Sequence, residues 1–377
     1  MKDVFIVDGL RTAIGKHAGA LKDVRPDDMA AALIKEILKR NFEKNNLSPE
    51  EIEDVILGNA NGAGEENRNV ARMSSLLAGL PVSAGGVTVN RLCGSGMQAF
   101  IDGVRGIRNG EGDCYLTGGV ESMTRAPFVL AKNPEAYGRR AEMFDTTIGW
   151  RFTNPTLAKM YNPYSMGETA ENVAEKYKVT RERQDEFAFD SQMKTKNAIK
   201  GGKFKEEIFP LEILSKKEKI IFDTDEFPRF DTTIEKLAKL KPAFREGGTV
   251  TAGNSSGIND GASMIMIASE EFVKRNNLKP RAKYLSSSVA GVDPSFMGIG
   301  PVPATKKALE RAGLKSDEID IIELNEAFAA QSLACIDELQ LDIKKINING
   351  GAIALGHPLG SSGSRIIITL LNELEKQ

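Results

Sequence analysis

Short apolar runs that end at glycine or at polar residues alternate with stretches of helical periodicity along most of the chain. Beyond a first strand over Val4–Val7, the apolar runs predict six buried strands: Asp54–Gly58, Gly86–Val89, Tyr115–Gly119, Ser263–Ala268, Ile319–Leu324 and Ile346–Asn349. The periodic stretches predict helices over Asp28–Arg40, Val70–Ala78, Gly96–Arg108, Ala304–Ala312 and Ser361–Glu375. This alternation indicates an α/β fold with a mostly parallel sheet and helices on both faces.

The pattern repeats within the chain. Leu47–Asn59 and Leu314–Glu326 each read as a polar turn, acidic residues and an Ile-rich strand. Gly85–Glu111 then parallels Lys345–Lys376 as strand, glycine turn and small-residue helix start. The repeat predicts two fused, similarly folded halves, and chance resemblance between two βα units is the alternative interpretation.

The repeat predicts one more strand than the chain provides. In the first half, the helix is followed by a strand and turn over Asp113–Ser122, whereas the second half reaches Gln377 where that strand would begin. A sheet without that strand would leave backbone donors and acceptors unpaired. We therefore expect the C-terminal half to be incomplete.

A segment of different composition separates the halves. Residues 124–248 are rich in charge, proline and aromatic side chains and hold one strong amphipathic stretch, Thr169–Ala198. This composition favours an inserted cap or loop domain over the sheet. The predicted organisation is an N-terminal half over 1–123, a loop domain over 124–248 and a C-terminal half over 249–377.

Composition narrows the classes of function. Fifty basic and 52 acidic residues give a net charge of −2, so no overall field favours nucleic acid or an anionic membrane. Three cysteines form no disulfide framework and fit a reducing compartment. No apolar segment approaches the roughly 18 residues of a spanning helix. A cytoplasmic protein without a membrane span or nucleic-acid partner is expected.

Cys93 is the candidate nucleophile. It lies in NRLCGSGMQAF, directly after a predicted strand and at the start of a helix. Backbone N–H groups and the helix dipole at such a junction stabilise a thiolate or an oxyanion, and cysteine suits thioester exchange. The alternative is a buried structural thiol, the interpretation preferred for Cys114 and Cys335.

His357 is the candidate general base. It lies in the glycine-dense loop GGAIALGHPLGSSGSR, which the repeat places at the end of the sheet equivalent to that of Cys93. A histidine that merely packs a turn is the alternative, and His17 is interpreted as a surface residue.

Asn325 opens the segment NEAFAAQ after a predicted strand, where its amide would hold a water or bind a carbonyl oxygen. Simple N-capping is the alternative role. Glu326 would orient a neighbour or carry a first-turn charge. The chain has no CxxC, HExxH or GxxxxGK[ST] motif, so neither a metal nor a P-loop is predicted.

Together these motifs resemble the thiolase family. The set comprises NRLCGSGMQA, NEAFAAQ and GGAIALGHPLGSSGSR, with GGVESMTRAP, MGETAENVAEKY and TVTAGNSSGINDGA in the same order along the chain. The segments AGEENRNVARM and FDTTIGWRFTNP look most like the β-ketoadipyl-CoA and related degradative members.

The resemblance implies an αβαβα layered fold of two similar halves with a loop domain that binds coenzyme A. It implies that Cys93 accepts the acyl group, that His357 activates it, and that His357 with a water on Asn325 forms one oxyanion hole. No cofactor is held permanently; coenzyme A is a co-substrate, the partners are CoA and acyl-CoA, and a homodimer or homotetramer is expected. Residues implied at the CoA site, including the pantetheine tunnel, are Arg229, Ser256, Met166, Leu157, Ala327 and Phe328.

The sequence departs from the family pattern at two places. Ser165 stands where members with acetoacetyl-CoA activity often have histidine, which argues against a short-chain biosynthetic enzyme. A second catalytic cysteine in a Cys-x-Gly loop, typical of thiolases, has no counterpart after His357.

The expected activity is ping-pong thiolytic cleavage of a 3-ketoacyl-CoA to acetyl-CoA and a shortened acyl-CoA, or the reverse condensation. Two alternatives stay open. A decarboxylating 3-ketoacyl synthase would need another histidine, and His17 is badly placed for it. A catalytically impaired acyl-CoA-binding homologue would account for the missing Cys-x-Gly loop.

Overall fold

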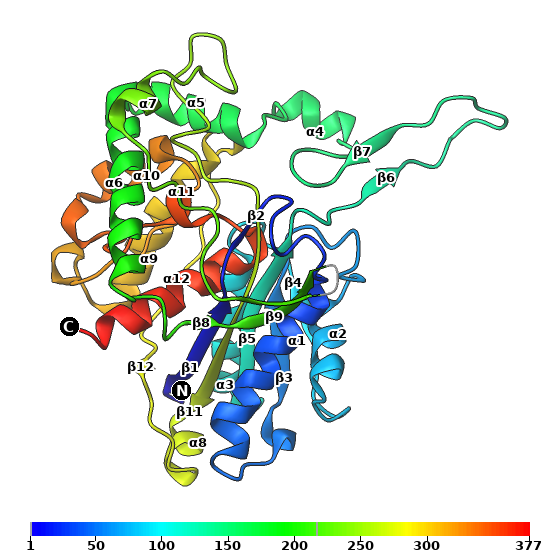
Figure 1. The fold of residues 1–377 in the computed structure, drawn as a ribbon, viewed down its shortest axis with the longest axis vertical. Helices are drawn as coiled ribbons and strands as arrows, with labels where there is room; N and C mark the ends of the chain where they lie inside the picture. The colour runs from blue at the N-terminus through cyan, green and yellow to red at the C-terminus, as the bar shows by residue number, and fades with distance from the viewer. Residues whose placement is uncertain (1, 216–217) are drawn as a thin grey trace.

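The computed structural model describes residues 2–215 and 218–377 and is organised around one mixed sheet (Figure 1). Its strand order is β12-β1-β11-β5-β3-β4, with β2 added on β11 and β8 on β1. The bounds are β1 Val4–Thr12, β2 Gly15–Lys16, β3 Asp54–Gly58, β4 Val87–Val89, β5 Cys114–Ser122, β8 Ile208–Phe209, β11 Asn259–Ser269 and β12 Ala282–Lys283.

The centre of the sheet is not parallel as predicted. Strands β3, β4 and β5 are parallel to one another, but β11 runs antiparallel to both of its neighbours, β1 and β5. The chain enters β11 from the loop domain, at the sheet edge where β1 and β5 end, so it runs back between them. Although β11 follows residue 249 in the chain, it pairs only with N-terminal strands, and the predicted division at 249 stays a prediction.

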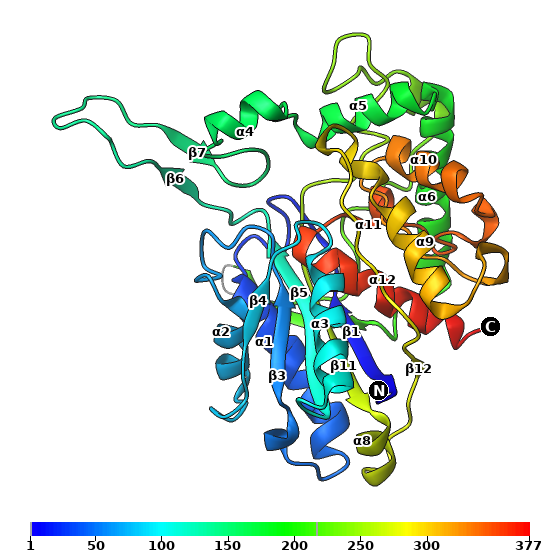
Figure 2. The ribbon, with the colours of Figure 1, turned by 180° about the vertical axis from the view of Figure 1, so that it is seen from behind.

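The sheet is buried on both faces. Alternate residues of β5 and β11 point to opposite sides: Leu116 and Met264 pack in a core with helix α1, and Tyr115 and Ile265 in a core with helix α3. Figures 1 and 2 show α1 and α2 covering one face and α3 with α12 the other. Burial on both faces gives continuous apolar runs rather than alternation, which made these strands recognisable.

The five helices predicted from periodicity are present within a few residues at each end: α1 Pro26–Ile37, α2 Val70–Ala78, α3 Ser95–Asn109, α9 Pro301–Ala312 and α12 Leu359–Leu374. The described residues also form α4 Pro155–Met160, α5 Met166–Lys176, α6 Arg181–Lys200, α7 Ile234–Ala238, α8 Glu270–Arg275, α10 Ala329–Leu339 and α11 Ala352–Leu355. A π-helix continues α1 over Leu38–Glu43, and short 3-10 turns span Pro49–Glu51, Pro294–Ile299, Ser316–Glu318 and Ile343–Lys345.

Within the predicted loop domain, a short turn divides the predicted amphipathic stretch into two helices. Thr169–Ala198 contributes to two helices, α5 and α6, because Lys178 adopts a φ of +54° and Thr180 caps the second helix. Two small hairpins complete this segment, β6 Phe128–Leu130 with β7 Met143–Asp145 and β9 Leu211–Ser215 with β10 Glu218–Phe222. The first hairpin projects far from the body (Figures 1 and 2).

Two predicted strands in the C-terminal half are wrong. Ile319–Leu324 and Ile346–Asn349 meet only at one parallel bridge, Ile322 to Ile346. Asn347 turns the chain at a φ of +43°, and its side chain takes up the Leu324 N–H and carbonyl in place of further ladder bonds. The bridge still repeats the parallel contact of β3 with β4, and the turns Pro49–Glu51 and Ser316–Glu318 occupy equivalent places, as the internal repeat predicts.

A buried arginine ties the sheet to the loop domain. Arg11 of β1 is 1% exposed and donates to Glu207 (2.7 Å) and, with both terminal nitrogens, to Asp225 (2.7 and 2.9 Å). Such a network tolerates the loss of one partner poorly, because an uncompensated charge then stays buried.

We predict that Asp225→Ala lowers the free energy of unfolding by about 3–5 kcal/mol. Asp231→Ala is the matched control, because its ion pair with Lys236 (2.6 Å) is exposed and should cost no more than about 1 kcal/mol. Urea denaturation of both variants measures the difference, and equal losses would contradict the structural role of Arg11.

Candidate active site

The site lies at the edge of the sheet where β3, β4 and β5 end. Because these strands are parallel, the residues that follow each of them meet at one edge. Asn59, Ala60 and Asn61 follow β3, Cys93 comes shortly after β4, and Glu121 lies at the end of β5. This edge therefore gathers residues that are far apart in the sequence.

Cys93 lies in a tight turn fixed by two side chains. Asn90 accepts the Leu92 N–H (2.9 Å) and donates to the Ala60 carbonyl (2.8 Å). Ser95 accepts the Arg91 N–H (2.8 Å) and donates to the Leu92 carbonyl (2.6 Å). Leu92 has a φ of +48°, an uncommon conformation for its type. The turn holds Cys93 just before α3, as the sequence predicted, and the residue is partly exposed there.

The N-termini of α3 and α12 meet beside this turn. A Cβ on Gly96 would lie 2.7 Å from the Gly360 carbonyl oxygen and 2.6 Å from the Ser364 hydroxyl, so only glycine permits the contact. Cys93 precedes α3 and His357 precedes α12, so the structure brings these two loops together. Two positive helix ends at one place favour an oxyanion there.

His357 is buried and fixed at three points. Its backbone N–H donates to the side-chain oxygen of Asn259 (2.9 Å). In the ring, Nδ1 lies 2.6 Å from the Ser362 hydroxyl and Nε2 lies 3.4 Å from the Asn325 amide nitrogen. Ser362 donates its only proton to the Pro358 carbonyl (2.9 Å), so Nδ1 of His357 must carry the proton that Ser362 accepts. Nε2 is then the free base and faces Asn325.

Asn325 supplies a donor and an open acceptor. Its Nδ2 faces His357, while its Oδ1 is buried and has no hydrogen-bond partner within the described ranges. Glu326, next to it, is buried and accepts from Ser191 (2.6 Å) and Asn347 (2.8 Å). Glu326 thus anchors the loop, the orienting role considered from the sequence, and Asn325 can bind a water or a carbonyl group.

Charge and burial shift the protonation of both reactive groups. Burial, and to a lesser degree the nearby Glu121 carboxylate, raises the pKa of Cys93 to about 11. Burial, with the Arg365 charge second, lowers the pKa of His357 to about 4. At neutral pH the pair is therefore thiol and imidazole rather than thiolate and imidazolium.

Glu121, which the sequence analysis did not single out, joins the loops of the site. Its carboxylate accepts from the N–H groups of Ala60 (2.8 Å), Asn61 (3.1 Å) and Gly360 (2.8 Å). Burial raises its pKa to about 7 in spite of these bonds. The available signal was an acidic residue at the end of an otherwise apolar strand.

Four of the six residues assigned to coenzyme A lie around one short antiparallel contact. Ser256 donates its N–H to the Ala327 carbonyl (2.9 Å), and Ser255 bridges Phe328. Phe328 packs edge-on against Phe244 (6.1 Å between ring centroids), which in turn covers Gly167, the residue after Met166.

The other two residues lie farther out. Arg229 is exposed and stacks over Phe227 (5.5 Å), whose ring abuts Gly257, so it borders the same group. Leu157 lies on α4 and is 44% exposed, and the contacts that join the other residues do not reach it.

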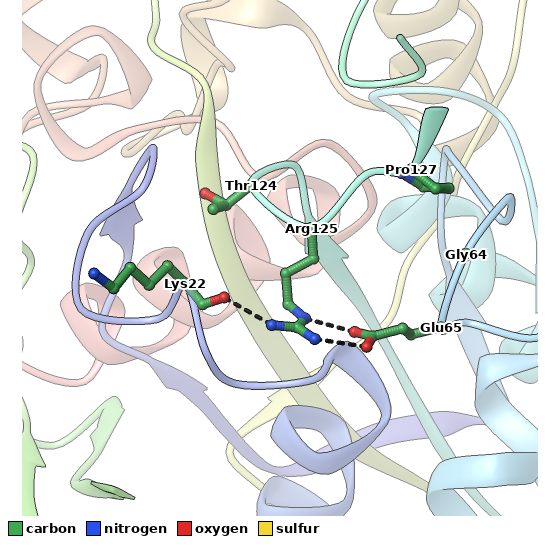
Figure 3. Close-up of a pocket in the computed structure, with 6 residues that line it drawn as sticks. All are labelled: Lys22, Gly64, Glu65, Thr124, Arg125 and Pro127. Atoms are coloured by element: carbon green, nitrogen blue, oxygen red, sulfur yellow. Dashed lines mark hydrogen bonds and ion pairs between the residues drawn. The ribbon is translucent and has the colours of Figure 1, made fainter. Parts of the chain in front are cut away.

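A separate pocket of about 500 Å³ lies on the rim and contains none of these residues. Lys22, Gly64, Glu65, Thr124, Arg125 and Pro127 line it. Figure 3 shows that Arg125 is already engaged by both carboxylate oxygens of Glu65 and by the Lys22 carbonyl.

Among residues 2–215 and 218–377, no helix is long and apolar enough to cross a membrane, and no group of three His, Cys, Asp or Glu side chains could hold a metal ion.

Comparison with known protein families identifies the chain over almost its whole length. The family described as "Thiolase, N-terminal domain" matches residues 4–271, and "Thiolase, C-terminal domain" matches residues 278–377.

Individual relatives agree with this result. A 3-oxoadipyl-CoA/3-oxo-5,6-dehydrosuberyl-CoA thiolase of Escherichia coli K12 is 53% identical over 380 residues, covering 100% of this chain and 94% of its own. A β-ketoadipyl-CoA thiolase of Acinetobacter baylyi is 52% identical with the same coverage. The crystal structure of the Bacillus anthracis acetyl-CoA acetyltransferase has a TM-score of 0.92 at 41% identity, covering 100% of this chain and 93% of its own. The chain has the thiolase fold and belongs to the thiolase family.

Proposed function

We propose that the chain cleaves 3-oxoadipyl-CoA, or a closely similar 3-ketoacyl-CoA, with coenzyme A. Family membership supports thiolytic cleavage of a 3-ketoacyl-CoA, and the relatives at 52–53% identity named for 3-oxoadipyl-CoA support the narrower substrate. The observation that carries the proposal is the convergence of the Cys93 turn and the His357 loop at two helix N-termini, with Asn325 against Nε2. Nothing in the comparisons favours a catalytically impaired homologue.

In the first half-reaction, Nε2 of His357 takes the Cys93 proton as sulfur attacks the 3-keto carbon. The neutral, Nδ1-protonated imidazole that Ser362 supports is the form this step needs. The Cα–Cβ bond then breaks, its electron pair passes to acetyl-CoA as the enolate, and the enolate takes the proton that Nε2 of His357 accepted from Cys93. The remaining acyl group stays on Cys93 as a thioester.

In the second half-reaction, the thiol of a second coenzyme A attacks this thioester and releases the shortened acyl-CoA. Both steps build negative charge on a carbonyl oxygen. The N–H groups at the start of α3 and a water or N–H at Asn325 would stabilise it, each donor being worth roughly 3–4 kcal/mol.

Ser256, Ala327, Phe328 and Met166 would line the pantetheine arm of coenzyme A, with Arg229 near its charged end, because they surround the loop that carries Asn325. Leu157 would border the site from α4. The expected oligomeric state stays a homodimer or homotetramer, and the expected location stays the cytoplasm.

The reactivity of the resting Cys93 thiol tests its protonation state. Because the pKa of Cys93 is about 11, its thiolate fraction should rise about tenfold per pH unit, and alkylation by iodoacetamide about 100-fold between pH 7 and 9. Peptide mass spectrometry measures the rate, with buried Cys114 and Cys335 as internal controls. His357→Asn should leave this profile unchanged, whereas a plateau below pH 8 would reveal a preformed ion pair.

Turnover of 3-oxoadipyl-CoA tests the proposed activity directly. With 3-oxoadipyl-CoA and coenzyme A, the protein should release acetyl-CoA and succinyl-CoA and carry a succinyl group on Cys93 after rapid quenching. His357→Ala should lower kcat by roughly 10²–10⁴-fold and Asn325→Ala by roughly 10²–10³-fold. Chromatography of the CoA esters checks this. Absence of both products with the unaltered protein would refute the proposed function.

A further inference from the structure

Arg151 is a cation beside the active site without an acidic partner. Its Nη2 donates to the backbone carbonyl of Asn61 (3.2 Å) and to the Asn61 side-chain oxygen (3.3 Å). Within residues 2–215 and 218–377, Arg151 forms no ion pair. Nearby Arg125, by contrast, is neutralised by Glu65 (Figure 3).

The anchor holds Arg151 in one orientation. The Asn61 amide donates to the Thr146 hydroxyl (3.2 Å), which donates to the Pro127 carbonyl (2.6 Å). The side-chain oxygen of Asn61 is thereby directed toward the guanidinium. Of the three guanidinium nitrogens of Arg151, only Nη2 donates to Asn61. A free edge of the planar guanidinium can therefore bind a carboxylate with two parallel hydrogen bonds.

The same loop joins Arg151 to the reacting groups. The Asn61 N–H donates to Glu121 (3.1 Å), whose charge acts on Cys93, and the Ala60 carbonyl accepts from Asn90 of the nucleophile turn. Arg151 therefore borders the wall formed by residues 59–61. The residues assigned to coenzyme A lie on a different wall, around Asn325.

The backbone on both sides of Arg151 adopts an uncommon conformation. Gly149 has a φ of +92° and Phe152 a φ of +50°, the latter uncommon for an aromatic residue. Trp150 and Phe152 are half exposed on either side. A cation between exposed apolar side chains suits an acyl chain that ends in a negative charge.

We propose that Arg151 binds the carboxylate at the far end of the acyl chain, selecting 3-ketoacyl-CoA substrates derived from dicarboxylic acids. The inference rests on the proposed function and adds the residue that distinguishes such substrates from those ending in a methyl group. A group built to hydrogen-bond one substrate end rejects analogues that lack it, because its own polar atoms then stay unpaired.

The test compares 3-oxoadipyl-CoA with 3-oxohexanoyl-CoA, which has the same chain length but a terminal methyl group. Arg151→Gln should lower kcat/KM for 3-oxoadipyl-CoA by roughly 10–100-fold and change that for 3-oxohexanoyl-CoA less than threefold. Arg151→Lys should give an intermediate ratio, because it keeps the charge without the fork. Arg139→Gln, on the exposed tip of the β6–β7 hairpin, is the matched control and should change neither value.

Equal effects of Arg151→Gln on both substrates, or no effect on either, would overturn the assignment. So would a loss of preference in Arg68→Gln instead, since Arg68 is an exposed arginine in the neighbouring loop. These outcomes presuppose cleavage of 3-oxoadipyl-CoA by the unaltered protein. Failure of that cleavage would refute the proposed function itself, so the two failures are distinguishable.

Discussion

The active site depends on one buried carboxylate. Glu121 ends the central strand β5 and accepts N–H groups from the loop after β3 and from the start of α12. A carboxylate in such a place is costly to bury unless its oxygens are bonded, and here each bond also fixes a functional loop. Because burial raises its pKa from 4.5 to about 7, the folded chain holds more protons than the unfolded chain in that range. Its contribution to stability therefore falls as pH rises from 4.5 to 7.

A second constraint on the active site is the close approach of the N-termini of α3 and α12, which small residues permit. The starts of α3 and α12 approach closely because Gly96 and Gly363 lack side chains: a Cβ on Gly96 would meet Ser364, and a Cβ on Gly363 would meet the Met97 backbone. The close approach places the loops of Cys93 and His357 at the same two positive helix ends. Burial then keeps both groups neutral at rest, so the proton leaves Cys93 when a carbonyl group arrives to take up the developing charge.

The two walls of the site separate two tasks. In the proposed function, the wall around Asn325, Ala327 and Phe328 binds the common part of every substrate, coenzyme A. The wall of residues 59–61 then holds the variable end of the acyl chain, next to Arg151. The two walls can change independently in such an arrangement, because Glu121 and the paired helix ends keep the reacting groups fixed between them.

The sequence by itself determined the elements whose signals are local. The apolar runs at β3 and β5, the periodicity of α2 and α3, and the strand–helix junction of Cys93 all lie within a few neighbouring residues, and the structure has them there. His357 precedes helix α12 as expected, but the short helix α11 comes before it in place of the predicted strand. Only the tertiary structure decided which distant groups meet. Glu121 and Gly360 are 239 residues apart, β11 runs antiparallel because of where the chain returns, and the single bridge of Ile322 depends on the turn at Asn347. Local patterns report whether a residue is buried, whereas its partner is set by long-range packing, so the roles of Ser362, Glu121 and Arg151 became visible only in the fold.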